Sequence, residues 1–267
     1  MSPGGSGGAW RIGFLCGALL LTAAACADPA RERFERAEKE LLSQKMEAAL
    51  SDYRLIARDH PQSRYAPAAL LRQGDLYGGY YRNFPAALEA YGSLVYNYPR
   101  ASEAPRALMR TAEIHLLQYL DPSSAAADLE RIRKEFPRVE GEDEVLFLLA
   151  RAYGAAGEDG RQAAALAELT KRFPKSRRAA EGRWMLAYAL LGQRRYADAD
   201  REFRKLLYLS TERESSVQAR WGVAQSLEGM GDLPGAIAQY EALRGDAGGP
   251  AFVAEKIERL KARLRKP

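Results

Sequence analysis

The sequence predicts an all-α protein in which pairs of helices stack along one axis. Four similar stretches, DHPQS, NYPRAS, EFPRVE and RFPKS, carry the prolines Pro61, Pro99, Pro137 and Pro174, which lie 38, 38 and 37 residues apart. A fixed step of this length is the signature of a helical solenoid. Strand-like alternation is missing from the sequence, and 47% hydrophobic and 28% charged residues are typical of a globular chain.

Further columns of residues keep the same step and predict how the helices pack. One column is small, and a bulky residue follows each of its members by three positions. A large apolar column lies eight residues before each proline, and a second small column lies four residues before the large one. Small residues at fixed offsets let two helices approach closely, while bulky ones fill the space between neighbours. The small column is Gly74, Ala112, Ala150, Ala187 and Ala224, followed by Tyr77, His115, Tyr153, Leu190 and Leu227; the large column is Tyr53, Tyr91, Leu129, Leu166, Phe203 and Tyr240, preceded by Ala49, Ala87, Ala125, Gln162, Ala199 and Ala236.

These columns predict six helix pairs and a last single helix. In chain order the pairs cover about 29–59, 65–97, 103–135, 141–172, 177–209 and 214–244, and the last helix covers 250–265. Each proline ends the second helix of a pair, because proline cannot continue the hydrogen-bond ladder. The first and last helices are far more charged than the others, as expected for elements that cap a solenoid and turn one face to water.

The spacing Ala-x3-aromatic-x7-Pro, with a small-x-x-Tyr pattern in the preceding helix, resembles the tetratricopeptide repeat over roughly residues 46–245. The resemblance implies an all-α, right-handed solenoid of about six such helix pairs plus a C-terminal capping helix. Leu70, Leu108 and Leu146 replace the usual early tryptophan, the last two prolines are missing, and the period is longer than usual. The longer period resembles envelope members of the family such as BamD, the outer-membrane assembly lipoprotein, and YbgF (CpoB), the Tol–Pal-associated protein.

Residues 1–25 are predicted to be a lipoprotein signal peptide, and 26–267 the solenoid domain. Arg11 precedes an uncharged run, IGFLCGALLLTAAA, which is short for a membrane span but suits a signal peptide. The run ends in AAAC, which resembles a bacterial lipobox except that Ala23 replaces the preferred leucine, and this implies lipidation of Cys26. Ala27 then favours the outer membrane, by the same resemblance. Cleavage after Ala25 or Ala27 would instead give a soluble periplasmic protein.

No catalytic residue, cofactor or metal site is expected. The two histidines, His60 and His115, stand in columns otherwise held by bulky residues, so packing explains them, and neither has a neighbouring Cys or His. Cys16 falls within the signal segment and Cys26 is predicted to be acylated, so no free thiol is expected. Forty Lys and Arg against thirty-five Asp and Glu give a net charge of +5, a mixed surface from which no nucleic-acid binding is expected.

The most basic stretch of the chain, KRFPKSRRAAEGRWM over 171–185, looks at first like a nucleic-acid patch. Phe173-Pro174 keeps the step of Tyr98-Pro99 and Phe136-Pro137, so the stretch is predicted to be a joint between two repeats. Its arginines are then expected to be solvated charges at an exposed turn.

One pair of columns suggests a partner-binding groove. The first column lies three residues before the small one, and the second lies one residue after it, so their members are four apart on one helix face. In tetratricopeptide repeats the corresponding positions of the first helix line the inner groove, and aromatic residues there suit peptide binding. The alternative is that these side chains pack on the preceding repeat as core. The predicted groove residues are Leu71, Met109, Phe147, Trp184 and Trp221 with Asp75, Glu113, Arg151, Tyr188 and Gln225.

The sequence therefore favours a lipid-anchored periplasmic scaffold that binds envelope proteins or peptide segments and is not an enzyme. Outer-membrane protein assembly, as by BamD, is the first choice. A coordinator of Tol–Pal and cell division like YbgF and a pilotin-type lipoprotein for a secretin are the rivals. A module that binds peptidoglycan or polysaccharide is an alternative of another class, since aromatic rings also stack on sugars. Fold resemblance alone does not decide among these functions.

Overall fold

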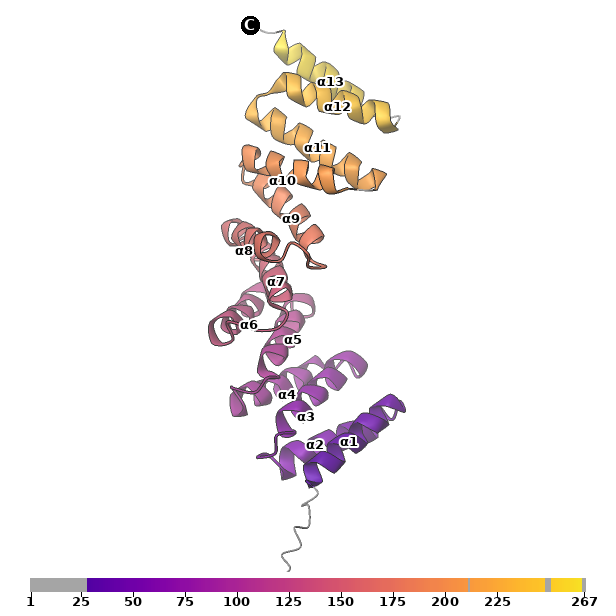
Figure 1. The fold of residues 1–267 in the computed structure, drawn as a ribbon, viewed down its shortest axis with the longest axis vertical. Coiled ribbons are helices and arrows are strands. Elements are labelled where there is room, and N and C mark those ends of the chain that lie inside the picture. The colour runs from indigo at the N-terminus through magenta and orange to yellow at the C-terminus, as the bar shows by residue number, and fades with distance from the viewer. Residues whose placement is uncertain (1–27, 211, 248–250, 266–267) are drawn as a thin grey trace, which may run out of the picture.

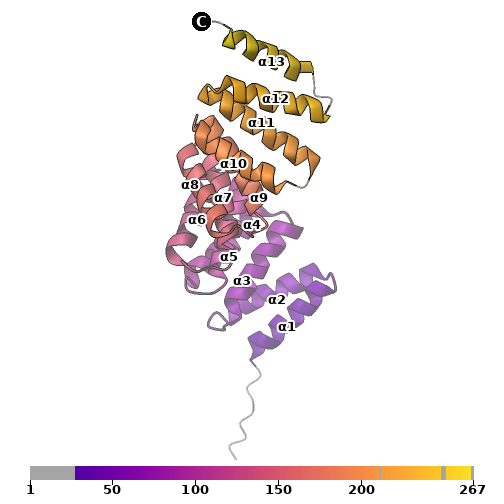
Figure 2. The ribbon, with the colours of Figure 1, turned by 45° about the horizontal axis from the view of Figure 1, so that its top comes forward.

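The computed structural model describes residues 28–210, 212–247 and 251–265, and these residues form thirteen α-helices and one π-helical turn, with no strand among them. The helices stack in chain order from α1 at one end to α13 at the other (Figures 1 and 2). Their bounds are α1 (Pro29–Leu42), α2 (Met46–Asp59), α3 (Ala66–Asp75), η1 (Leu76–Tyr80), α4 (Phe84–Asn97), α5 (Ala104–Leu117), α6 (Pro122–Glu135), α7 (Glu142–Ala155), α8 (Asp159–Arg172), α9 (Ala179–Gly192), α10 (Tyr196–Leu209), α11 (Arg213–Met230), α12 (Leu233–Ala247) and α13 (Ala251–Leu264).

The helices pair as the sequence predicts, and each helix packs on its neighbours in the chain. The first helices of adjacent repeats also contact one another, α3 with α5, α5 with α7 and α9 with α11, whereas no contact of comparable size joins successive second helices in the described part of the chain. A stack that is tighter on one side curves toward that side. The odd-numbered helices α1 to α11 therefore form the inner layer of the solenoid, and the even-numbered helices form the outer layer.

The large apolar column forms the centre of the core, as predicted. Its members Tyr53, Tyr91, Leu129, Leu166, Phe203 and Tyr240 are between 0% and 2% exposed. The small column makes room for it: a Cβ on Gly74 would lie 2.2 Å from Tyr91 Cε1. Gln162 is the one large residue in the second small column, and it faces Gly154, whose Cβ would lie 2.3 Å from Gln162 Nε2. At both places a large side chain is matched by a glycine on the helix that faces it.

The turn inside each pair contains one residue with positive φ. These residues are Gln44, Arg82, Leu120, Gly157, Arg194 and Gly231, so they keep the 37- to 38-residue step of the core columns. The left-handed conformation ends the first helix and reverses the chain, and only glycine adopts it without steric cost. Four of the six turns therefore carry a modest backbone strain.

The basic stretch over 171–185 is a joint between repeats, as predicted, but its arginines are paired and not merely solvated. Arg172 Nη2 donates to Glu142 Oε2 over 2.6 Å, and Arg178 Nη2 donates to Glu144 Oε1 over 2.7 Å. Arg177 Nη2 also donates to Glu144, over 3.2 Å. The hydrogen bond from Arg178 holds the pKa of Glu144 below its usual range. These ion pairs bind the start of α9 to the first turn of α7.

The predicted signal peptide, 1–25, and the predicted lipid site, Cys26, lie outside the described residues. The solenoid begins immediately afterwards, since the side chain of Asp28 caps α1 by accepting a hydrogen bond from the Ala30 amide. Within the residues that the structure describes, none of the helices is both long and apolar enough to cross a membrane.

Candidate partner-binding surface

All ten predicted groove residues lie on the inner helices α3, α5, α7, α9 and α11, but two of them are core. Leu71 is 6% exposed and Phe147 is 1% exposed. Phe147 packs with Leu146 and Leu169, and the guanidinium of Arg178 covers its ring at 4.5 Å. A partner cannot reach either side chain, so the prediction that Leu71 and Phe147 line the groove is wrong.

The other members of this column, Met109, Trp184 and Trp221, are half-buried and pack against the core with part of their surface. Trp221 meets the edge of Tyr240 at 5.0 Å and of Phe252, on α13, at 5.5 Å between ring centroids. The half-exposed Phe252 from the capping helix therefore covers part of Trp221. Packing explains one side of each of these residues, and their role in partner binding stays a prediction.

Trp184 and Tyr188 form the most open aromatic surface among these inner positions. Their rings lie nearly parallel, at an angle of 21°, with centroids 6.1 Å apart, and Tyr188 is 46% exposed. The buried ring of Phe203 supports both of them from below, edge-on. A hollow of about 620 Å³ opens beside the two rings and is also lined by Gln162, Glu181, Met185 and Ala189. We call Trp184, Tyr188 and Met185 the aromatic platform.

Partial burial raises the pKa of the Tyr188 hydroxyl, so this residue stays neutral at physiological pH. The aromatic platform therefore presents uncharged, flat surface to solvent. Such a surface suits apolar and aromatic side chains or the apolar face of a sugar ring.

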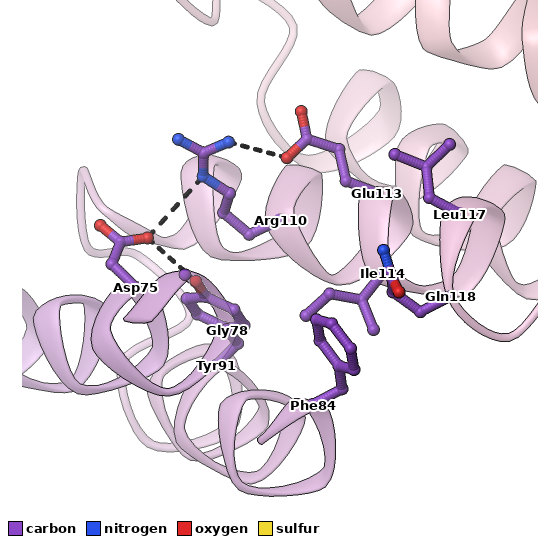
Figure 3. A pocket seen from close by; sticks show the side chains of 10 residues that line it. Asp75, Gly78, Phe84, Tyr91, Arg110, Glu113, Ile114, Leu117 and Gln118 are labelled. Atoms are coloured by element: carbon purple, nitrogen blue, oxygen red, sulfur yellow. Dashed lines mark hydrogen bonds and ion pairs between the residues drawn. The ribbon is translucent and has the colours of Figure 1, made fainter. Parts of the chain in front are cut away.

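A second hollow, of about 450 Å³, lies between the second and third repeats and brings Asp75 and Glu113 to one rim (Figure 3). Arg110 stands between the two carboxylates: its Nη1 donates to Glu113 Oε2 over 2.8 Å, and its Nε lies 3.7 Å from Asp75 Oδ1. The hydroxyl of Tyr91 also donates to Asp75 Oδ1, over 2.9 Å. These rim charges are therefore bound to one another across the repeat boundary.

The hollow has an apolar lining, and two glycines form part of its wall. Phe84, Ile114 and Leu117 line it, together with Gly78 and Gly79. These glycines belong to η1, where the Tyr81 amide donates to the Leu76 carbonyl over 3.0 Å, five residues back. A Cβ on Gly79 would have no atom within 4 Å. The absence of a side chain at residue 79 thus widens the hollow.

The first repeat contributes equivalent residues that the sequence analysis missed. One step of 37 residues back from Leu71 and Asp75 leads to Phe34 and Glu38, on α1. Glu38 accepts hydrogen bonds from the Tyr53 hydroxyl over 2.6 Å and from Arg72 Nε over 2.8 Å. The repeat step alone would have predicted these two residues, because the columns of Leu71 and Asp75 can be extended by one step toward the N-terminus. With them, the inner surface extends over all six repeats.

His115 lies beside a carboxylate and not in a cluster of metal ligands. Its Nδ1 is 3.1 Å from Asp128 Oδ2, and burial raises the pKa of Asp128. Over the described ranges, no group of three His, Cys, Asp or Glu side chains is arranged to hold a metal ion.

Comparisons with known proteins agree with this architecture. Residues 144–176 match the tetratricopeptide repeat family, and no curated protein sequence matches the chain. Among solved structures, a tetratricopeptide repeat protein from Parabacteroides merdae is 18% identical, with 88% of this chain and 86% of that chain covered and a TM-score of 0.56.

Two further structures are similar to the chain in fold. YrrB, described as a tetratricopeptide repeat protein with an unusual peptide-binding site, is 9% identical; 78% of this chain and 97% of that chain are covered, with a TM-score of 0.60. PilW, described as a type IV pilus biogenesis factor, is 13% identical; 85% and 98% are covered, with a TM-score of 0.51. At these identities the likeness concerns the fold alone. With its helix pairs, its core columns and these neighbours, the chain is an all-α tetratricopeptide-repeat solenoid.

Proposed function

We propose that this chain is a lipid-anchored periplasmic scaffold that holds segments of other envelope proteins against the inner surface of its solenoid. The observation that carries the binding role is the aromatic platform: stacked, neutral, half-open rings beside a hollow of about 620 Å³. Aromatic residues in partly desolvated pockets are the common anchors of protein interfaces. Tetratricopeptide solenoids generally act as scaffolds for protein interactions, and YrrB is described as having a peptide-binding site.

The platform can bind a segment at little conformational cost to the receptor. Trp184 and Tyr188 stand on one helix, α9, and are supported by the fully buried ring of Phe203. Because the rings are held before binding, the segment alone has to be ordered. A binding role therefore needs no moving part of the solenoid.

The envelope location rests on the sequence before the solenoid. A signal-like segment ends at Cys26, and only Ala27 separates that residue from Asp28, the N-cap of α1. An extended chain spans about 3.3–3.6 Å per residue, so lipid on Cys26 would hold α1 within about 10 Å of the membrane surface. In a Cys26→Ser variant we expect the protein to move from the membrane fraction to the soluble periplasm; an unchanged distribution would argue against lipidation.

Among envelope roles, assembly of outer-membrane proteins, as by BamD, remains the first choice. A YbgF-like role with Tol–Pal and a pilotin-type role remain its rivals. PilW, with a similar fold, is described as a pilus biogenesis factor, which supports an envelope role for such solenoids. Affinity purification of the intact lipoprotein from detergent-solubilised envelope distinguishes these roles by the subunits that it enriches.

The binding role is tested by replacing the platform and leaving the fold intact. We expect Trp184→Ala with Tyr188→Ala to abolish co-purification of the partner, while the helical signal in circular dichroism is retained. Tyr208, which is 90% exposed on the outer helix α10, gives the matched control, since Tyr208→Ala should leave the partner bound. If the platform variant is folded and still retains its partner, the binding role of these residues is wrong.

A glycan-binding module remains the second candidate, because the same parallel rings of Trp184 and Tyr188 suit the face of a sugar. Sedimentation with purified peptidoglycan separates the two candidates. Retention that depends on Trp184 and Tyr188, without any enriched protein, would favour the glycan.

A further inference from the structure

The inner surface divides into a part whose charges are paired within the protein and a part with an available cation. In the first repeats a carboxylate follows the small column, and an arginine two residues before the small position of the next repeat binds it. Arg72 Nε donates to Glu38 Oε1 over 2.8 Å, and Arg110 Nε lies 3.7 Å from Asp75 Oδ1. Arg106 Nη2 also donates to Asp75, over 3.4 Å. The inner carboxylates of repeats one and two are thus neutralised.

This ladder of ion pairs stops at the fourth repeat. The position equivalent to Arg72 and Arg110 is Leu148, which is 3% exposed and part of the core. Glu113 therefore has no cross-repeat partner among the described residues and pairs back along its own helix with Arg110, over 2.8 Å. The pattern of the N-terminal half does not continue beyond α5.

Arg151 takes the place of the carboxylate in this fourth repeat. It is half-buried on α7, and it makes no hydrogen bond, ion pair or ring contact with any residue that the structure describes. A guanidinium carries five N–H donors in a fixed fork that matches a carboxylate. Partial burial lowers the local dielectric and strengthens any ion pair formed there. Arg151 is therefore an available carboxylate-binding group on the inner surface.

The next inner helix changes from charge to aromatic surface. One step beyond Arg151, the same column holds Tyr188, and the position of the pairing arginine holds Met185. Both belong to the aromatic platform with Trp184. A cation on α7 is thus followed by apolar surface on α9.

We propose that the segment bound by the inner surface carries an aspartate or glutamate close to a large apolar side chain, with the carboxylate on Arg151 and the apolar side chain on the platform. This inference rests on the proposed binding function and specifies its ligand. α7 and α9 both pack on α8, so their axes lie more than one and less than two interhelical distances of about 8–10 Å apart. An extended peptide advances about 3.3 Å per residue, so the two side chains lie about three to six residues apart in the segment.

The test is a selection from a random dodecapeptide library, displayed on phage, against the full chain held in detergent. Peptides retained by the unaltered protein should be enriched in Asp or Glu about three to six residues along the chain from Trp, Phe, Leu or Met. Arg151→Gln should bind a selected peptide about 10- to 100-fold more weakly, as expected for loss of a charged hydrogen bond. Arg100→Gln is the matched control: Arg100 is exposed at the joint after α4, and its replacement removes the same charge away from α7 and α9.

Charge reversal gives the decisive arm. Arg151→Glu should select Lys or Arg where the unaltered protein selects Asp or Glu. If Arg151→Gln and Arg151→Glu retain the same acidic peptides, the role of Arg151 is wrong, although peptide binding that still requires Trp184 and Tyr188 leaves the proposed function standing. If the unaltered protein retains no peptide above the Trp184→Ala, Tyr188→Ala variant, both proposals fail.

Discussion

Replacing Gly74 by alanine tests why the repeat requires a small residue at this position. The new Cβ would stand 2.2 Å from Cε1 and 2.6 Å from Cδ1 and Cζ of Tyr91, whereas carbon atoms in contact are normally about 3.5–4.0 Å apart. The Tyr91 ring is 2% exposed, and its hydroxyl donates to Asp75 over 2.9 Å. The ring cannot move aside without leaving its site in the core or breaking this hydrogen bond.

Two opposing effects set the size of the change. Alanine in place of glycine favours the helix by about 1 kcal/mol. Overpacking of a core costs about 1–3 kcal/mol, and a lost hydrogen bond to a carboxylate costs about 1.5–3 kcal/mol. When both costs apply the clash prevails, so we expect Gly74→Ala to lower the free energy of unfolding by about 1.5–5 kcal/mol.

Urea unfolding followed by far-ultraviolet circular dichroism measures this change. Gly92→Ala is the matched control, because Gly92 neighbours Tyr91 on α4 but an added Cβ there has no atom within 4 Å; it should stabilise the protein by up to about 1 kcal/mol. Adding Tyr91→Leu to Gly74→Ala should recover part of the loss, since Leu129 and Leu166 fill this column in other repeats. If Gly74→Ala stabilises the protein as Gly92→Ala does, the packing argument is refuted.

Two further predictions concern charge and backbone strain. Asp52 is 7% exposed and accepts hydrogen bonds from Arg36 and Arg33. The bond from Arg36 is the main cause of the lowered pKa of Asp52. The ionised carboxylate therefore stabilises the fold fully above its unfolded pKa of about 3.9, and this stabilisation is lost as the pH falls through the lower folded pKa. Asp52→Asn should therefore cost about 1–3 kcal/mol at neutral pH and flatten the acid limb of stability measured from pH 7 to pH 2, whereas an unchanged acid limb would exclude Asp52 as its source. Arg194 is exposed and has a φ of 59°, and Arg194→Gly should raise the thermal midpoint through a gain of about 1 kcal/mol; a lowered midpoint would contradict the assignment of strain to this turn.

The helix pairs and the core could be predicted because they depend on spacing along the chain. A small residue on one helix and a large one on the next must meet in every repeat, so their spacing stays at 16 or 17 residues, as for Gly74 and Tyr91, and this recurrence identifies the packing. The turns with positive φ keep the same step but use arginine, leucine and glutamine as well as glycine, so residue type gave no signal there.

The surface was harder to predict, because exposure depends on neighbours from other repeats. Phe147 and Trp184 occupy the same column, yet Arg178 from the following joint covers Phe147 while Trp184 stays half-open. The ion pair between Arg178 and Glu144 likewise joins residues 34 positions apart. Such contacts depend on which repeats stack on each other, so they cannot be predicted from the residues of one column.

Site-specific photocrosslinking in cells tests most directly whether the inner surface binds a partner. A photoreactive phenylalanine analogue would replace Tyr188 on the inner helix α9 or, as the control, Tyr208 on the outer helix α10, which is 90% exposed. We predict that position 188 yields a discrete crosslinked partner, that the yield falls when Arg151 is replaced by glutamine, and that position 208 yields none. Equal crosslinking at both positions, or crosslinking at position 208 alone, would contradict an inner binding surface.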